Sequence, residues 1–209
     1  ATEELSEKMS ILQALALHAS SAIRSELTRR RLDAENQLRR QANLCPSADA
    51  FLDQAVRIVA DAFASEGCDV FCPARGGGID LVAHFEKTGA PDHYELGQGL
   101  TGATAKLRRP IRVSEVGNNG ELQRLKKVFA ADTPLEWSKA CPYAPHRDRK
   151  TSQYMGAPLF LRDDDQRVGV LRVRRKRDEA SGWHRYMPMD EELLVGLADV
   201  IAESVAHYK

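Results

Sequence analysis

The stretch from Tyr94 to Val116 limits the fold more than any other part of this 209-residue chain. Three glycines fall within six positions, at Gly97, Gly99 and Gly102. Such spacing gives the backbone the freedom of a tight turn. Apolar residues follow at helical spacing, at Leu100, Ala103 and Leu107. Pro110 ends that helix, and the alternation in residues 111–113 is typical of a short half-buried strand. The stretch therefore predicts a glycine turn, a short helix and a strand.

The same glycines match the dinucleotide-binding fingerprint Gly-x-Gly-x-x-Gly. That site needs a buried parallel strand before the first glycine and a long helix after the last. Residues 92–96 are too polar for such a strand, and only seven residues separate Gly102 from Pro110. We therefore interpret the glycines as turn geometry and not as a phosphate-binding loop.

Residues 2–41 contain neither proline nor glycine and predict one long helix. Apolar residues step alternately by four and three, at Leu5, Met9, Leu12, Ala16, Ala19 and Ile23. This spacing is the a/d seam of a coiled coil, and it continues to Leu38 through a stutter between Ala19 and Arg31. A helix of roughly 40 residues is about 60 Å long, which the rest of the chain is too small to cover. We expect a homodimer, with a single amphipathic helix packed on its own domain as the alternative.

The remaining chain predicts two hairpins flanked by helices. Strands are expected at residues 68–72, 79–85, 153–161 and 168–173, and helices at 48–65, 122–129 and from 190 onward. Ser47 is a candidate cap for the first of these helices. Hairpins with helices segregated around them indicate an α+β domain with an antiparallel sheet. We therefore expect a coiled-coil or signalling helix at residues 1–42 and a domain at 43–209.

Composition argues against several classes of function. Thirty basic and thirty acidic residues cancel, so no net field favours nucleic acid or an anionic membrane. No apolar run reaches the roughly 20 residues of a membrane span, and no export signal opens the chain. Four cysteines fit a reducing compartment, so we expect a cytoplasmic protein. The Cys68–Cys72 spacing lacks a second ligand pair, and no metal site is expected. The basic run at 174–177 is expected to emerge into solvent.

Three segments resemble GAF domains. Residues 97–105, GQGLTGATA, with residues 109–113, RPIRV, resemble the central motif of that family. Residues 154–160, YMGAPLF, followed by residues 168–173, VGVLRV, resemble its paired core strands. Lys176, Tyr186, Asp190 and Glu191 are similar to part of the signature of cyclic-nucleotide-binding members, although Arg174 or Arg175 stands at its Asn and Tyr186 at its Phe. Residues 12–31 are similar to the terminal helix of a preceding GAF domain in a tandem sensor chain.

The resemblance implies an α+β fold, GAF/PAS-like, with a central antiparallel sheet of about six strands and helices on its faces. It also implies a small-molecule pocket over one face and dimerisation through the N- and C-terminal helices. The expected function is a non-catalytic sensory module of bacterial-type signalling that controls an output domain outside this chain. Cyclic nucleotides, haem and bilins bind to members of the family, but the sequence requires no cofactor and leaves the ligand unknown.

Six candidate pocket residues follow from the resemblance: Thr101, Trp137, Cys141, His146, Tyr154 and Arg172. Four of them have a simpler interpretation. Thr101 could cap the short helix and Tyr154 could be ordinary core, whereas His146 and Arg172 could be solvated.

Two other functions remain open. A free methionine sulfoxide reductase attacks its substrate with a cysteine thiolate, but Thr101 stands where that family places a cysteine inside the glycine motif. A bilin-binding photosensor attaches its tetrapyrrole in the loop that holds Cys141, usually at an adjacent Cys-His pair, whereas His146 lies five residues later. We therefore expect no enzymatic activity.

Overall fold

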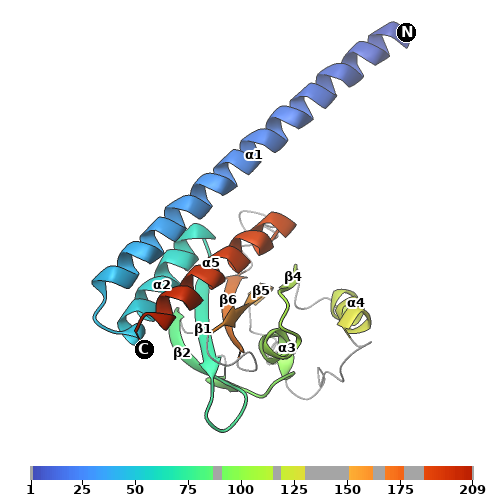
Figure 1. The fold of residues 1–209 in the computed structure, drawn as a ribbon. Coiled ribbons are helices and arrows are strands. Elements are labelled where there is room, and N and C mark those ends of the chain that lie inside the picture. The colour runs from blue at the N-terminus through green and yellow to red at the C-terminus, as the bar shows by residue number, and fades with distance from the viewer. Residues whose placement is uncertain are drawn as a thin grey trace.

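The computed structural model describes residues 2–86, 91–114, 119–129, 151–161, 168–176 and 186–208. Its helices are α1 (Thr2–Leu44), α2 (Ala48–Ala62), α3 (Gly99–Leu107), α4 (Asn119–Phe129) and α5 (Pro188–Ala206). Its strands are β1 (Gly67–Pro73), β2 (Ile79–Phe85), β3 (His93–Tyr94), β4 (Ile111–Val113), β5 (Thr151–Phe160) and β6 (Val168–Lys176). The α+β class, the sheet of six strands and the long N-terminal helix confirm the predicted fold (Figure 1).

The strands form one sheet in the order β3-β2-β1-β6-β5-β4, and every neighbouring pair is antiparallel. The two predicted hairpins, β1–β2 and β5–β6, meet at the centre, where Val70 pairs with Leu171. The edge strand β3 lies within residues 92–96, which the sequence marks as too polar for a buried strand. Two residues are too few to display an alternating pattern, so the strand had no signal in the sequence.

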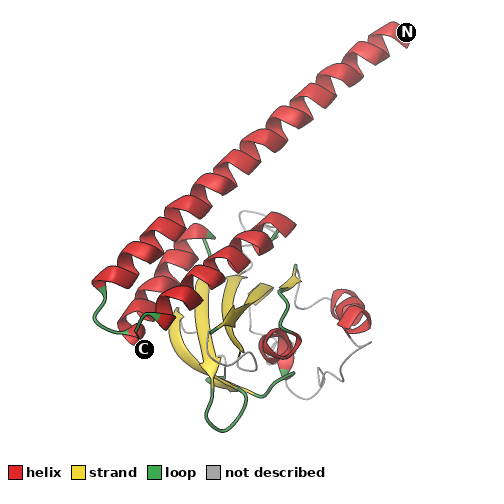
Figure 2. Ribbon diagram, viewed as in Figure 1, coloured by secondary structure: helices red, strands yellow, loops and turns green. Residues whose placement is uncertain are grey.

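One face of the sheet is covered by α2, α5 and the C-terminal part of α1 (Figure 2). Alternate residues of the central strands, among them Val70, Leu171 and Val173, belong to this apolar core. Their neighbours in the chain point to the opposite face, because side chains alternate along a strand. On that face Val170 and Phe71 pack with Tyr94 and Ala105, below α3. The sheet therefore lies between the helical layer and a second buried region under α3. We call this region the compartment under α3; its apolar residues are Phe71, Ile79, Tyr94, Ala105 and Val170.

Helix α2 begins where the sequence predicts, because Ser47 accepts a hydrogen bond from the backbone nitrogen of Ala50 over 3.2 Å. It ends at Ala62, three residues earlier than the prediction. Ala64 has a φ of 46°, in the left-handed region, and a helix does not continue through that conformation.

Helix α1 belongs to the domain only through its C-terminal part. Ala34 and Leu38 are buried in the core, although the sequence placed them on a coiled-coil seam, because α1 lies against α2 and α5 at this level. The hydroxyl of Tyr208 donates to the carbonyl oxygen of Ala42 over 2.6 Å. The N-terminal half of α1 extends away from the domain (Figure 1). Within the part of the chain that the structure describes, no helix has the length and apolar character needed to cross a membrane.

Candidate functional site

The glycine turn places α3 over the sheet. Gly97 and Gly99 have φ values of 91° and 59°, which residues other than glycine rarely adopt. A Cβ atom on Gly102 would collide with the carbonyl oxygen of Glu95, so the turn and the first turn of α3 touch through their backbones. The three glycines therefore serve backbone geometry, and they position Thr101 and Thr104 in the buried face of α3.

A buried ionic cluster lies on the sheet below α3. Asp69 of β1 accepts hydrogen bonds at Oδ2 from Nε of Arg172 over 2.8 Å and from Nε of Arg174 over 2.9 Å. Arg174 also donates from Nη2 to Oδ1 of Asp69 over 3.1 Å. None of the three side chains is more than 3% exposed. Charges are costly to bury without partners, so the shared carboxylate is what allows two arginines to occupy this position.

Arg172 connects the cluster to α3 and to the edge of the sheet. Its Nη1 donates to Oγ1 of Thr101 over 3.0 Å and to the hydroxyl of Tyr94 over 3.2 Å. The guanidinium carbon lies 4.8 Å from the ring centroid of Phe71, within the range of a cation–π contact. One side chain thus joins β1, β3, β6 and α3.

A second polar contact joins α3 to β5 on the same face. The hydroxyls of Thr104 and Tyr154 lie 3.1 Å apart, and Thr104 also donates to the carbonyl oxygen of Leu100 over 2.9 Å. Gly156 is required beside them, because a Cβ atom there would collide with the hydroxyl of Tyr154. The floor of this compartment is therefore polar at two points, Arg172 and Tyr154, within apolar surroundings.

Three of the six candidate residues lie on this one face: Thr101, Tyr154 and Arg172. The other three, Trp137, Cys141 and His146, lie outside the described residues. Thr101 is not a helix cap, since the N-cap of α3 is Gln98. The alternative that Arg172 is solvated is wrong, because its side chain is fully buried.

The expectation that the basic run emerges into solvent is wrong at Arg174, which is 2% exposed. The run begins inside the sheet because Asp69 lies on the adjacent strand and pairs with it. Sequence reasoning also missed Asp69 and Tyr94. Asp69 had a signal, since a single charged residue in the apolar strand Cys68–Cys72 predicts a buried partner.

Strand β4, beside the compartment under α3, is bonded to the start of α5. Strand β4 follows α3 directly, and Arg112 in it donates from Nε to Oε2 of Glu191 over 3.2 Å and from Nη1 to the carbonyl oxygen of Tyr186 over 3.0 Å. Asp190 caps α5 by accepting from the backbone nitrogen of Met187 over 2.7 Å. Arg112 therefore joins β4 to the start of α5 through one ion pair and one hydrogen bond to the backbone.

Two cysteines near this site are poor candidates for thiolate chemistry. Burial raises the pKa of the Cys68 thiol well above its ordinary value, and burial also raises the pKa of Cys72 to about 11. Both thiols are therefore protonated at neutral pH, and the thiolate is the nucleophilic form. Cys141 lies outside the described residues.

Two hollows lie away from the cluster. One, of about 590 Å³, lies at the β1–β2 turn and includes Asp80, His93 and Glu95 in its lining. The other, of about 410 Å³, lies between α1 and the first turns of α5, with Leu27, Arg31 and Leu193 among its residues. Arg172 lines neither of these two hollows.

A family model described as GAF domain matches residues 47–205. The chain belongs to the GAF domain family. The match spans every strand of the sheet together with α2, α3 and α5, so the face below α3 is part of the family fold. No match is found among curated proteins.

Solved structures with the same fold serve different functions. A putative GAF sensor protein from Burkholderia vietnamiensis has 17% identity and a TM-score of 0.62, covering 87% of this chain and 97% of its own. A free methionine-R-sulfoxide reductase from Neisseria meningitidis, in complex with its substrate, has 14% identity and a TM-score of 0.60, covering 84% and 87%. A protein in a far-red absorbing dark state with bound biliverdin has 12% identity and a TM-score of 0.57, covering 84% and 98%. At these identities the likeness concerns the fold alone.

Proposed function

We propose that this GAF domain is a non-catalytic sensory module. It binds a small ligand with hydrogen-bond acceptors between α3 and the sheet, and it transmits binding through dimeric α1 and α5 helices to an output domain linked in the same polypeptide. The observation that carries the proposal is the buried Arg172, which is held by Asp69 and donates to Thr101 across the compartment.

The cluster suits a ligand that offers acceptors. Nη1 of Arg172 donates to two neutral hydroxyls, those of Thr101 and Tyr94. A carboxylate or phosphate oxygen would form a stronger, charge-assisted bond at the same nitrogen. Nη1 of Arg174 has no hydrogen-bond partner within the described ranges, and a buried donor of this kind favours an acceptor nearby.

Ligand binding would act on two structural connections. A ligand that replaces Thr101 at Arg172 displaces α3, which leads into β4 and so to the contact between Arg112 and Glu191. Movement of β6 also reaches the helical layer, because Leu171 and Val173 alternate with Arg172 and pack in that core. The ligand shifts the helices only by its differential affinity for their two arrangements.

A reductase is the enzymatic alternative. The thiolate that such chemistry needs is not supplied by Cys68 or Cys72, and Thr101 carries a hydroxyl bound to Arg172 at the position expected for a cysteine. An assay with free methionine sulfoxide and a thiol reductant separates the two functions, and we expect no turnover. The bilin photosensor alternative is tested by expressing the chain in cells that also synthesise biliverdin. We expect the purified protein to be colourless.

The experiment compares the protein as purified with the same protein unfolded in guanidinium chloride, dialysed and refolded. A ligand bound to the folded state stabilises it by mass action, so the refolded sample should unfold at a lower temperature at equal protein concentration. Returning the small molecules released on unfolding should restore the midpoint. Identical midpoints for both samples, with no change when the released fraction is added back, would contradict ligand binding.

A further inference from the structure

The two residues of strand β3 point to opposite faces of the sheet. Tyr94 is fully buried in the compartment under α3, where its hydroxyl accepts from Nη1 of Arg172 over 3.2 Å. His93, the residue before it, is exposed and lines the hollow at the β1–β2 turn. Successive side chains of a strand alternate between its faces. One short strand therefore carries a titratable group on the outside and a contact of the candidate site on the inside.

The imidazole of His93 joins two carboxylates. Its Nδ1 lies 2.6 Å from Oδ1 of Asp80 on β2, and its Nε2 lies 3.3 Å from Oε1 of Glu95. The ring also lies against the β1–β2 turn, because a Cβ atom on Gly78 would come 2.9 Å from Nε2. Only a protonated imidazole has a hydrogen on both nitrogens, so both contacts are hydrogen bonds in that form alone.

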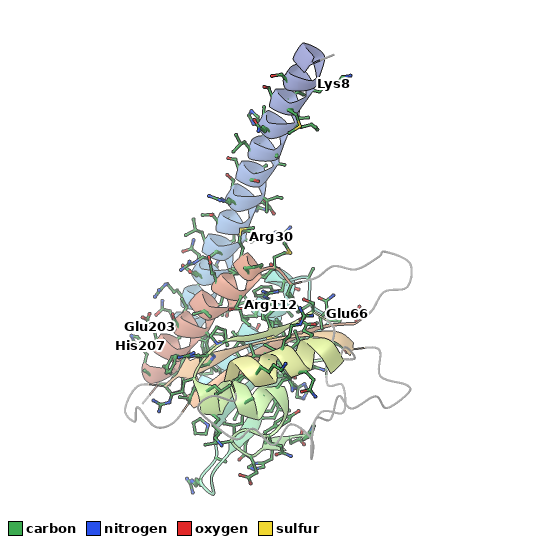
Figure 3. All side chains as sticks on the ribbon, turned by 90° about the vertical axis from the view of Figure 1, so that its right-hand side faces the viewer. Lys8, Arg30, Glu66, Arg112, Glu203 and His207 are labelled. Carbon is green, nitrogen blue, oxygen red and sulfur yellow. The ribbon has the colours of Figure 1, made fainter. Side chains whose placement is uncertain are left out.

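The other residues of the hollow leave the charge change to His93. Besides Asp80 and Glu95, the titratable or charged residues of the described lining are Arg75 and Cys72. An arginine keeps its charge in proteins, and burial raises the pKa of Cys72 to about 11, so neither changes its charge near neutral pH. The β1–β2 turn, at the bottom of Figure 3, lies at the opposite end of the molecule from Lys8 on α1.

Glu95 connects the histidine to the start of α3. Its backbone nitrogen donates to the side-chain oxygen of Gln98, the N-cap of α3, over 2.8 Å. Its carbonyl oxygen accepts from the backbone nitrogen of the same residue over 2.9 Å. The first turn of α3 then brings Thr101 to Nη1 of Arg172. The segment that begins at the hollow thus reaches the buried guanidinium at two points, Tyr94 and Thr101.

We propose that His93 is a proton-dependent switch on the compartment under α3. The protonated ring holds Asp80 and Glu95 together, and it keeps β3 and the glycine turn closed over Arg172. The neutral ring has one N–H and cannot bond both carboxylates, so the longer contact, to Glu95, is lost and the turn loosens. Control of ligand access by this switch rests on the proposed sensory function, whereas the switch itself needs no ligand.

The sign of the pH dependence follows from the two carboxylates. Hydrogen bonds to Asp80, the larger cause, and to Glu95 raise the pKa of His93 above its ordinary value of 6.5. The closed form is therefore complete below pH 6.5 and is lost as the pH rises through the raised pKa of the folded protein.

The test is amide hydrogen exchange of the purified chain, measured by NMR at about pH 5.5 and about pH 8.5, on either side of the ordinary histidine pKa. Rates are expressed as protection factors, which remove the intrinsic pH dependence of exchange. The amides of Gly97, Gln98 and Gly102 form hydrogen bonds in the glycine turn and the first turn of α3. Their protection should fall by about twofold to fivefold at the higher pH, the range expected for an exposed ion pair. Amides at the centre of β1 and β6, those of Val70 and Leu171, should keep theirs.

Glu95→Gln separates the switch from the titration. Its amide can accept from the protonated ring or donate to the neutral ring, so the protection of Gly97 and Gln98 should become independent of pH. His93 should still titrate in this variant, because Asp80 is the larger cause of its raised pKa. Glu192→Gln, a matched change at an exposed position of α5, should retain the behaviour of the unmodified chain.

Three results would overturn the proposal: an unmodified chain whose turn keeps its protection while His93 titrates, a Glu95→Gln variant that retains the pH dependence, or an equal loss of protection at Val70 and Leu171. The last would mean that the whole domain is destabilised at the higher pH. A chain that shows the predicted pH dependence but retains no small molecule would support the switch and contradict the sensory function, so the two proposals can fail separately.

Discussion

Arg172 and Asp69 face each other on neighbouring strands, with 2.8 Å between Nε and Oδ2, and neither side chain reaches solvent. Their positions are paired in the register of β1 and β6. A buried ion pair of this kind adds little net stability compared with apolar residues, but removing one partner leaves the other charge uncompensated. The pair is therefore better explained by a role at the site than by a role in stability.

Asp69→Asn should destabilise the fold by about 3–5 kcal/mol, because it leaves both arginine side chains without their shared carboxylate. Urea unfolding followed by circular dichroism measures this change. Asp80→Asn is the matched control: its carboxyl is 55% exposed, so the loss should be about 1 kcal/mol or less. Similar losses in the two variants would contradict the buried cluster.

Thr104 and Tyr154 should be energetically coupled through their hydroxyls, which lie 3.1 Å apart and are buried. A double-mutant cycle with Thr104→Val and Tyr154→Phe should give a coupling energy of about 0.5–1.5 kcal/mol. Strictly additive effects in urea unfolding would show that the two hydroxyls do not interact in solution.

His93 should titrate above its ordinary pKa of 6.5. Hydrogen bonds to Asp80, the larger cause, and to Glu95 raise its pKa. Because the pKa of the folded state is raised, the stabilisation is fully present below pH 6.5 and is lost as the pH rises through the folded value. A proton NMR titration should place the midpoint above 6.5, and Asp80→Asn should lower it. An unchanged midpoint in the variant would refute the assignment to Asp80.

Arg112 should hold the first turn of α5 to β4. Arg112→Gln should speed amide hydrogen exchange of residues 189–192 at a stability cost of about 1 kcal/mol or less, since both partners of the ion pair are partly exposed. Arg39→Gln is the control, because Arg39 pairs with Glu203 near the other end of the same helix, at 3.6 Å. Faster exchange at residues 189–192 in both variants, or in neither, would contradict the connection.

Most of the fold could be predicted from the sequence, because the patterns that indicate its helices, strands and turns are periodic and local. The glycine turn, the two hairpins and the face of α2 each follow from spacing within a short segment. The edge strand β3 was missed, since its two residues depend on pairing with Ile79 and Asp80. The burial of Ala34 and Leu38 was also missed, because the same spacing serves a coiled coil and a helix packed on its own domain.

Only part of the candidate site could be predicted from the sequence. Thr101, Tyr154 and Arg172 were identified through family resemblance, and the structure places them on one face. Arg174 was expected in solvent because a run of four bases usually is, and its partner Asp69 is 105 positions away in the chain. Pairings across such separations are set by strand register, which composition and periodicity do not define.

Native mass spectrometry of the purified chain tests the central claim most directly, because it measures the mass of the folded protein with whatever it retains. The sensory account predicts a species heavier than the polypeptide by one small molecule per chain, and loss of that excess mass on denaturation. Folded protein at the bare polypeptide mass, which also fails to take up any compound from an extract of its own host cells, would contradict it.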